Sequence, residues 1–202
     1  MNDCPLCEQA MNVAPSWQSL LGFDKQTMIC QDCSKKFQRA DIKEENAYLD
    51  QVTSLYIYND IMRDYLHQFK FLQDVQLASV FAQELRKYLT RKATIVPIPM
   101  HPEKKIQRTF AHVDELLKCA RIPYSELLEK IDQDAMGEKS RAQRLAMKPL
   151  FTLKPGVTIH PGTYILVDDI YTTGTTLRHA AAVLRQAGAT RIEAVTLIRA
   201  ER

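Results

Sequence analysis

Two adjacent carboxylates end an apolar run near the carboxyl end of the chain. In the segment YILVDDIYTTGTTLRHAAAVLRQAG, residues 164–188, Asp168 and Asp169 follow four apolar residues. A loop rich in threonine comes next, made of Thr172, Thr173, Gly174, Thr175 and Thr176. Backbone N–H groups, hydroxyls and the dipole of a following helix all favour an anion, and Gly174 lets the backbone approach it. We therefore expect a monophosphate in this loop.

The two acids need a different ligand, because carboxylates beside a phosphate would repel it. A ribose 5-phosphate satisfies both requirements, with its phosphate in the loop and its 2- and 3-hydroxyls on Asp168 and Asp169, and it leaves space for a hydrated Mg²⁺ nearby. Successive strand side chains point to opposite faces, so both acids reach one sugar only if the strand has ended and bent. The alternative, an acidic turn with a capping threonine, explains the acids but not the loop and helix together.

Other phosphate motifs are missing. The chain has neither a glycine-rich loop followed by a Walker lysine nor a G-x-G-x-x-G sequence. Nucleoside triphosphates and dinucleotides are therefore disfavoured as ligands.

Four cysteines near the start form two Cys-x2-Cys pairs, Cys4 with Cys7 and Cys30 with Cys33, separated by 22 residues. Two such pairs predict a tetrahedral zinc site, and four thiolates leave no position open for catalysis, so the zinc would be structural. A redox or disulfide role is the alternative, but it needs only one pair, usually at the start of a helix. The fifth cysteine, Cys119, fits a small core residue of a helix.

The composition is that of a globular protein. The chain has 202 residues, of which 46% are apolar and 25% charged, which allows one main domain and a small appendage. The net charge of +3 is too small to indicate a nucleic-acid partner by itself. The amino-terminal sequence MNDCPLCEQAMN lacks the pattern of a signal peptide, and no window is apolar enough to span a membrane. We therefore expect a cytoplasmic protein with reduced cysteines.

Basic residues gather in three places, each of which is by itself typical of solvated surface. They are Lys35, Lys36 and Arg39; Lys104, Lys105 and Arg108; and Lys139, Arg141, Arg144 and Lys148. The stretch 137–148 is either a lid over a site or a segment that contacts DNA, and its lack of aromatic residues argues against base stacking there. Four aromatic residues elsewhere, Tyr56, Tyr58, Phe69 and Phe71, are expected in the core.

The sequence divides into a four-cysteine zinc module at 1–40, a polar linker at 41–50 and a main domain at 51–202. Within the main domain, strand and helix patterns alternate. Strands are expected at 52–58, 93–99, 163–168 and 191–198, and helices at 59–71, 77–89, 111–120 and 176–187. This alternation predicts an α/β fold with a parallel sheet and helices on both faces, and with ligands beyond the carboxyl ends of the strands.

At this point a family resemblance is specific. The sequence ILVDDIYTTGTT resembles the phosphoribosyl pyrophosphate signature of the type I phosphoribosyltransferases. Together with the cysteine module, the sequence VPIPMHPEKKIQRTF and the later SRAQR, it makes the chain similar to the ComF family over essentially its whole length. The resemblance implies a type I phosphoribosyltransferase-like parallel sheet flanked by helices, with a small amino-terminal zinc-ribbon module.

The resemblance also implies a role in natural transformation, in the uptake or processing of single-stranded DNA. The partners implied are a competence DNA-translocating ATPase of the ComFA type and a recombination mediator of the DprA type. By motif, Asp168 and Asp169 would be the catalytic residues and bind the ribose, and Thr172 to Thr176 would bind its 5-phosphate. The loop after 93–99 would face the pyrophosphate, with Lys104, Lys105 and Arg108 as candidates for its charge or for a DNA backbone.

Two departures from the family pattern weaken the expectation of turnover. Where the family carries Arg-Gly-Phe-Asn-Gln, this chain has the sequence RTFAH at 108–112, and Thr109 would hinder the backbone from approaching a pyrophosphate. Where the family has Arg-x-x-Asn, this chain has the sequence RLAM at 144–147. Ligand binding is therefore better supported than catalysis.

Three interpretations remain. The chain is a competence factor that binds single-stranded DNA and retains a phosphoribosyl pyrophosphate pocket, a phosphoribosyltransferase of nucleotide metabolism, or a non-catalytic adaptor with a vestigial pocket. DNA binding through several lysines and arginines would weaken steeply with salt, whereas docking of an apolar partner would not.

Overall fold

The computed structural model describes residues 3–11, 29–46, 48–72, 74–89, 92–100, 110–131 and 150–200. A five-stranded sheet in the order β1-β2-β7-β6-β3 lies at its centre. Its strands are β1 (Arg39–Asn46), β2 (Leu49–Ile57), β3 (Thr94–Pro97), β6 (Thr163–Tyr171) and β7 (Arg191–Arg199). The pairs β2–β7, β7–β6 and β6–β3 are parallel, and only β1 runs antiparallel to its neighbour. This mostly parallel α/β sheet confirms the predicted fold class.

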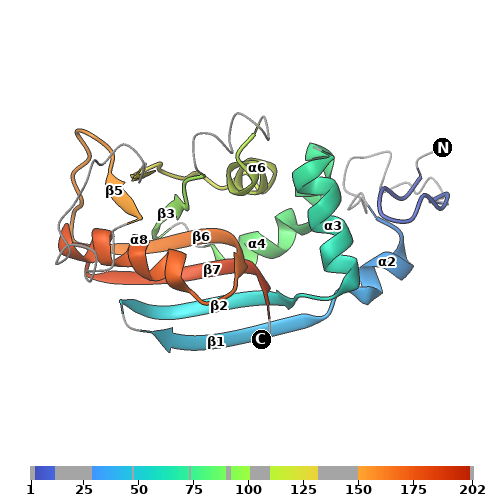
Figure 1. The fold of residues 1–202 in the computed structure, drawn as a ribbon, viewed down its shortest axis with the longest axis horizontal. Coiled ribbons are helices and arrows are strands. Elements are labelled where there is room, and N and C mark those ends of the chain that lie inside the picture. The colour runs from blue at the N-terminus through green and yellow to red at the C-terminus, as the bar shows by residue number, and fades with distance from the viewer. Residues whose placement is uncertain are drawn as a thin grey trace, which may run out of the picture.

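Helices cover both faces of the sheet (Figure 1). These helices are α3 (Asp60–Phe71), the 3₁₀ helix η1 (Val75–Phe81), α4 (Ala82–Tyr88), α6 (His112–Cys119) and α8 (Thr175–Gln186), whereas α2 (Gln31–Lys36) belongs to the cysteine segment. Side chains of α3, η1, α4 and α6 pack with Ile165, Val167 and Val195 in one core cluster. Side chains of α8 pack with Leu166 and Ala194 in a second cluster on the opposite face. The carboxyl ends of the strands, where a ligand is expected, therefore lie between two well-packed layers.

The polar stretch 41–50 is not a linker, contrary to the sequence prediction. Most of it forms β1, which pairs with β2 from Arg39 opposite Tyr56 to Asn46 opposite Leu49. An edge strand with one solvated side needs few apolar residues, so its composition resembles that of a linker. The single helix expected at 77–89 is also divided, into η1 and α4.

A short second sheet was not predicted. It consists of β4 (Leu128–Lys130) and β5 (Phe151–Leu153), which pair antiparallel. Strands of three residues are too short for an alternating pattern to be recognised in the sequence. The chain between them includes the basic stretch 137–148, which lies outside the described residues.

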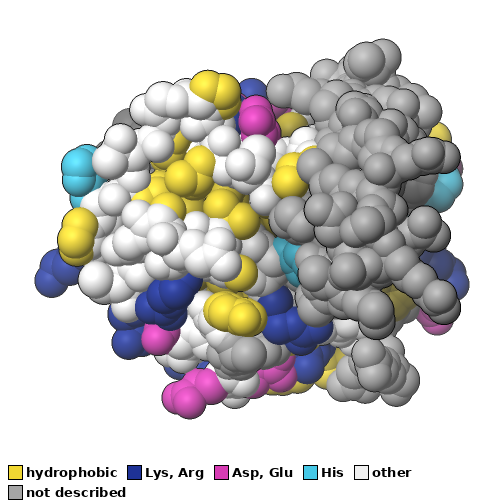
Figure 2. Space-filling model, turned by 60° about the vertical axis from the view of Figure 1, so that its left-hand side comes forward, with side chains coloured by type: hydrophobic (Ala, Val, Ile, Leu, Met, Phe, Trp, Pro, Cys, Tyr) yellow, Lys and Arg dark blue, Asp and Glu magenta, His cyan; other side chains and the backbone are white. Residues whose placement is uncertain are grey.

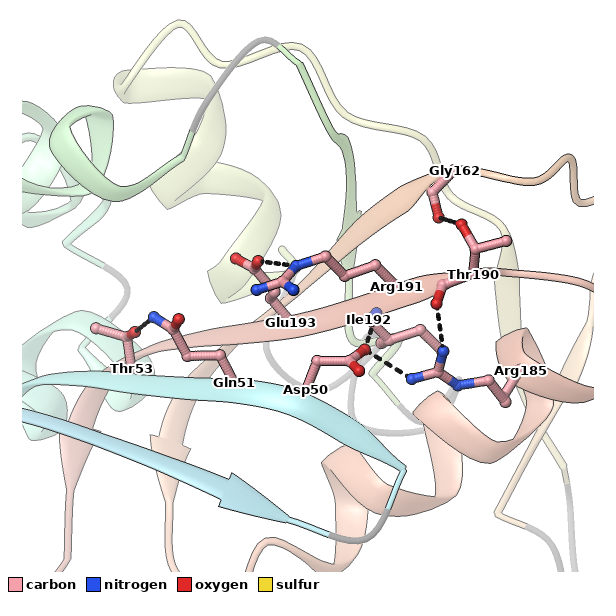
Figure 3. A network of polar contacts seen from close by, with 9 residues as sticks. All are labelled: Asp50, Gln51, Thr53, Gly162, Arg185, Thr190, Arg191, Ile192 and Glu193. Atoms are coloured by element: carbon pink, nitrogen blue, oxygen red, sulfur yellow. Dashed lines mark hydrogen bonds and ion pairs between the residues drawn. The ribbon is translucent and has the colours of Figure 1, made fainter.

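A polar network fixes the end of the sheet opposite the site (Figure 3). At the start of β2, Asp50 accepts hydrogen bonds from the Ile192 N–H and the Arg185 guanidinium, each at 2.7 Å. Arg185 also donates to the carbonyl oxygen of Thr190 at 2.6 Å. The network joins β2, β7 and α8, and so supports the order of the strands.

The cysteine segment packs against the main domain. Cys4, Ile29 and Cys33 are buried together, and Phe37, Ile61 and Val80 pack against them. The Phe37 ring also contacts the rings of Tyr65 and Phe81, with centroids 6.3 and 5.1 Å away. The segment therefore shares its apolar contacts with α3 and η1.

Within the described ranges, no helix has the length and apolar character needed to cross a membrane.

Candidate functional site

Asp168 and Asp169 lie inside β6, whereas the sequence analysis expected the strand to end at Asp168. β6 pairs with β7 as far as Tyr171 opposite Arg199. The change of direction occurs within the strand instead: Val167 and Ile170 pack on one core cluster although they are three residues apart. Strand side chains alternate with a period of two, so the alternation must slip once between these residues, at the two acids. The charge of Asp169 acts on Asp168, so the two carboxyl groups lie near each other.

The two carboxyl groups have different environments. The Asp168 carboxylate accepts a hydrogen bond from the Asp169 N–H at 2.9 Å. Burial, followed by the charge of Asp169, raises the pKa of Asp168 to about 8, although the charges of Lys70 and Lys130 oppose this. The raised pKa favours the protonated form of Asp168, which can donate a hydrogen bond. The carboxylate of Asp169 instead forms an ion pair with the ammonium group of Lys70.

Sequence reasoning missed Lys70. This residue lies in the last turn of α3, where a lysine ordinarily complements the helix dipole, so its type and position give no sign of a site. In the structure, its side chain is 13% exposed and that of Asp169 is 14% exposed. The Lys70 ammonium group therefore lies against one carboxylate oxygen of Asp169, beside which the sequence analysis expected a hydrated Mg²⁺.

The threonine loop leads into α8 as predicted. Thr172 and Thr173 are exposed, and the hydroxyls of Thr173 and Thr175 lie 2.9 Å apart. The guanidinium of Arg178 donates to the Thr175 hydroxyl at 3.2 Å. Sequence reasoning also missed Arg178, although a cation in the first turn of a helix is electrostatically unfavourable and could have indicated an anion there. Hydroxyls, a helix amino terminus and a guanidinium together form a suitable environment for a phosphate.

Gly174 is required by two features of the loop. Its φ of 71° lies in the left-handed region, and a Cβ built on it would lie 2.4 Å from the Tyr171 hydroxyl oxygen. Tyr171 is 4% exposed, and the Arg199 guanidinium lies over its ring at 4.2 Å, so the ring cannot easily move aside. Only glycine fits this position without displacing the loop.

We therefore expect Gly174→Ala to weaken the binding of ribose 5-phosphate by at least about tenfold and to lower the stability by about 2 kcal/mol. Isothermal titration calorimetry and thermal unfolding measure the two effects. Gly156→Ala is the matched control, because Gly156 has a φ of 78° but nothing within 4 Å of its added Cβ. This control is expected to lose about 1 kcal/mol of stability and no affinity. Equal affinity of Gly174→Ala and the parent protein would contradict the assignment.

The expected pyrophosphate side of the site is only partly described. Lys104, Lys105 and Arg108 lie outside the described residues, so their predicted role stays a prediction. The loop that carries them starts beside the acids, because the Ile98 N–H donates to the Val167 carbonyl at 2.9 Å. A cavity of about 270 Å³ lies at the start of this loop, and its lining residues include Pro99, Met100, Leu128, Lys130 and Lys154.

The four cysteines converge as predicted. The Sγ atoms of Cys4, Cys7, Cys30 and Cys33 all lie within 4.8 Å of one another, and those of Cys7 and Cys30 are 3.6 Å apart. Tetrahedral zinc with Zn–S bonds of about 2.3 Å places sulfur atoms about 3.8 Å apart, so the cluster fits such an ion. Cys119 lies on α6, away from this cluster, and packs against the main core as expected.

The basic groups do not consist only of solvated side chains, contrary to what the sequence indicated. Arg39 is not simply solvated: its guanidinium pairs with Glu84 at 2.5 Å and lies 5.1 Å from the centre of the Tyr56 ring. Figure 2 shows Lys and Arg side chains beside Asp and Glu side chains along one edge of the face drawn.

Among the aromatic residues expected in the core, Phe69 is 1% exposed but Tyr58 is 41% exposed.

Comparisons with known proteins agree with the site. The model of the phosphoribosyl transferase domain family matches residues 114–202, which include both acids and the threonine loop. The competence protein ComFC of Streptococcus pneumoniae (strain ATCC BAA-255 / R6) is 34% identical over 223 residues, covering 97% of this chain and 99% of the relative. The competence protein ComFC of Bacillus subtilis (strain 168) is 30% identical over 202 residues, covering 97% of this chain and 77% of the relative.

Among solved structures, a hypoxanthine phosphoribosyltransferase from Staphylococcus aureus is similar at 18% identity and a TM-score of 0.37. The match covers 63% of this chain and 64% of that chain.

Proposed function

The chain belongs to the ComFC family of competence proteins, and from this premise we propose that it binds phosphoribosyl pyrophosphate at Asp168, Asp169 and the threonine loop while assisting the uptake or processing of single-stranded DNA. The observation that supports this ligand is the acid pair beside a loop that leads into the amino terminus of α8. The competence role is supported by the names of the two relatives.

Each part of the ligand has a matching group. The 5-phosphate lies against Thr172 to Thr176, within reach of Arg178, which already donates to Thr175. The ribose hydroxyls meet Asp168, whose raised pKa favours the protonated form that can donate, and Asp169, whose carboxylate oxygens can accept. A neutral acid next to an ionised one suits hydroxyls, because each hydroxyl both donates and accepts hydrogen bonds.

The chemistry open to such a site is displacement at C1 of the sugar. The bond from C1 to the pyrophosphate oxygen breaks, pyrophosphate leaves with the electron pair, and a nucleophilic acceptor forms the new bond to C1. Positive charge develops on the sugar ring between these events, and the Asp169 carboxylate would stabilise it electrostatically.

The cysteine module and the partners complete the proposal. Cys4, Cys7, Cys30 and Cys33 hold a structural zinc ion, which keeps the module folded against α3 and η1. A DNA-translocating ATPase and a recombination mediator of the competence system are the protein partners that we propose, alongside single-stranded DNA.

The test combines binding and turnover. We expect phosphoribosyl pyrophosphate with Mg²⁺ to raise the melting temperature of the parent protein, since a ligand at 100 times its Kd stabilises by about 2.7 kcal/mol. The Asp168→Asn/Asp169→Asn variant should show no such rise. Glu193→Gln, which removes an exposed pair with Arg191 on β7, is the control and should keep it. No ligand-induced rise in the parent protein would contradict the proposal.

The same samples distinguish an enzyme from a binding protein. Pyrophosphate release is measured with free nucleobases or with single-stranded DNA as the acceptor. Release that the double variant abolishes makes the protein a phosphoribosyltransferase, and the active acceptor then separates nucleotide metabolism from DNA modification. A ligand-induced rise without release makes the pocket a binding site.

A further inference from the structure

The ion pair of Lys70 with Asp169 differs from the other lysine pairs of the described structure. Its side chains are 13% and 14% exposed, whereas the lysine of the pair between Lys87 and Glu84 on α4 is 64% exposed. Charges attract more strongly in a low-dielectric environment, and a buried charge without a partner is costly. The Lys70 ammonium is therefore firmly held at the acid pair, which a surface lysine would not be.

The packing of α3 fixes the position of the Lys70 ammonium group. Tyr65 and Phe69, on the same helix, are 0% and 1% exposed, and their rings stack with centroids 5.7 Å apart. The Tyr65 hydroxyl donates to the Leu77 carbonyl at 3.2 Å, which ties α3 to η1. At the other end of the helix, the Asn59 side chain accepts from the Met62 N–H at 3.1 Å. Lys70 thus reaches β6 from a rigid element.

The charges around the acids leave little attraction for a divalent metal ion. Lys70 occupies an oxygen of Asp169, and the Asp168 carboxylate already accepts the Asp169 N–H. Lys130 on β4 adds a second positive charge close enough to act on Asp168. A metal ion binding between the acids would have to displace one ammonium group and remain in the field of another.

We propose that Lys70 is the resident counter-ion of the Asp168–Asp169 pair, so that this protein presents both acids to the ribose hydroxyls without a divalent metal ion between them. The inference rests on the ribose role proposed above for the two acids. It concerns these acids only, and the diphosphate of a ligand remains free to carry its own Mg²⁺.

The first test needs no sugar. Mn²⁺ binding to the zinc-loaded full chain is followed by the electron paramagnetic resonance signal of free Mn²⁺. Lys70→Met is expected to bind Mn²⁺ at least about tenfold more tightly than the parent protein, because two adjacent carboxyl groups lose their cation. Lys70→Met/Asp169→Asn should lose this gain. Lys70→Arg, which keeps the charge, and Lys87→Met, which removes an exposed pair, should behave as the parent protein does.

Two results would overturn the proposal. One is equal Mn²⁺ affinity of Lys70→Met and the parent protein. The other is a Mn²⁺ site in the parent protein that Asp169→Asn abolishes, a result that needs no Lys70 variant and so holds even if Lys70→Met does not fold.

The second test separates this proposal from the proposed function. Ribose 5-phosphate binding is measured by calorimetry without added divalent metal and then with Mg²⁺. We expect the parent protein to bind equally in both buffers, and Lys70→Met to bind about tenfold more weakly without metal but normally with Mg²⁺. Failure of the parent protein to bind in either buffer contradicts the ribose site itself. Binding by the parent protein only with Mg²⁺ contradicts the counter-ion role alone.

Discussion

Replacement of Cys30 by serine is expected to reduce the zinc content of the protein to near zero. Cys30 is central to the cluster: its Sγ lies 3.6 Å from that of Cys7, and it accepts a hydrogen bond from the Cys33 N–H at 3.4 Å. Structural zinc binds with about 10–16 kcal/mol in small modules, and a preformed site rarely exists in the unfolded chain. Loss of one ligand therefore removes most of the energy that folds this module.

The consequences should be confined to the amino-terminal module and its contacts. The Phe37 ring, which packs on Tyr65 and Phe81, is expected to lose part of its burial, while the sheet and the threonine loop keep theirs. Zinc content is measured by elemental analysis, and the pocket by the melting-temperature rise with phosphoribosyl pyrophosphate, which should persist. Cys119→Ser is the control, because that cysteine lies outside the cluster and should leave the zinc content unchanged. Full retention of zinc in Cys30→Ser would refute the four-cysteine site.

Asp168→Asn is expected to stabilise the protein, and the gain should grow as the pH rises from about 4 to about 8. Burial and the charge of Asp169 raise the pKa of Asp168 from 3.8 to about 8. The folded state therefore holds this proton while the unfolded state releases it, so the stability due to Asp168 is complete below about pH 4 and is lost as the pH rises to about 8. Asparagine cannot ionise and escapes this loss.

The size of the gain in stability follows from the shift in the pKa of Asp168. Each pH unit in this window is worth on the order of 1 kcal/mol, or roughly 3 °C in melting temperature for a chain of this size. Asparagine also keeps a side-chain oxygen that can accept the Asp169 N–H, so the substitution need not remove that hydrogen bond. Thermal unfolding of the variant and the parent protein at pH 5, 6, 7 and 8 measures the difference.

Asp50→Asn provides a control of opposite sign. Burial of Asp50 opposes ionisation, but the Ile192 N–H and the Arg185 guanidinium outweigh it and lower the pKa of this carboxyl group. Its contribution to stability is present above the unfolded pKa and is lost as the pH falls through the lower folded value. Asp50→Asn should therefore destabilise the protein at neutral pH. A difference between Asp168→Asn and the parent protein that does not change with pH would refute the raised pKa of Asp168.

The raised pKa of Asp168, which makes Asp168→Asn stabilising, bears on the function proposed for this acid. The burial and like charge that disfavour ionisation of Asp168 favour its protonated form, which can donate a hydrogen bond to the sugar hydroxyl proposed as its ligand. The site is thus electrostatically strained at neutral pH in the absence of ligand, which is common where pKa values are shifted for function.

Local features of this protein could be predicted from the sequence. Asn59 and the apolar spacing after it indicate α3, and the structure starts this helix at Asp60 with Asn59 as its cap. The threonine loop and its single glycine indicate the start of α8, which the structure places one residue earlier, at Thr175. The four cysteines come together because two short turns each position a pair. In each case the interacting residues are neighbours in the chain, or their chemistry allows few alternatives.

Short or polar elements were missed for a physical reason. β1 is an edge strand whose solvated side is polar, and β4 and β5 have three residues each, so neither hydrophobic alternation nor length distinguished them. The extension of β6 through the acids was missed because carboxylates are rare inside strands and were interpreted as its end.

Only the tertiary structure decided the state of the acids. Asp169 forms an ion pair with Lys70, and the charge of Lys130 acts on Asp168. Both lysines are far from the acids in the sequence, and no local pattern connects them. The pairing with Lys70 depends on how Tyr65 and Phe69 pack α3 against the sheet. The sequence determined which groups are available for chemistry, but their protonation and pairing depend on burial and on charges from distant elements, which exist only once the chain has packed.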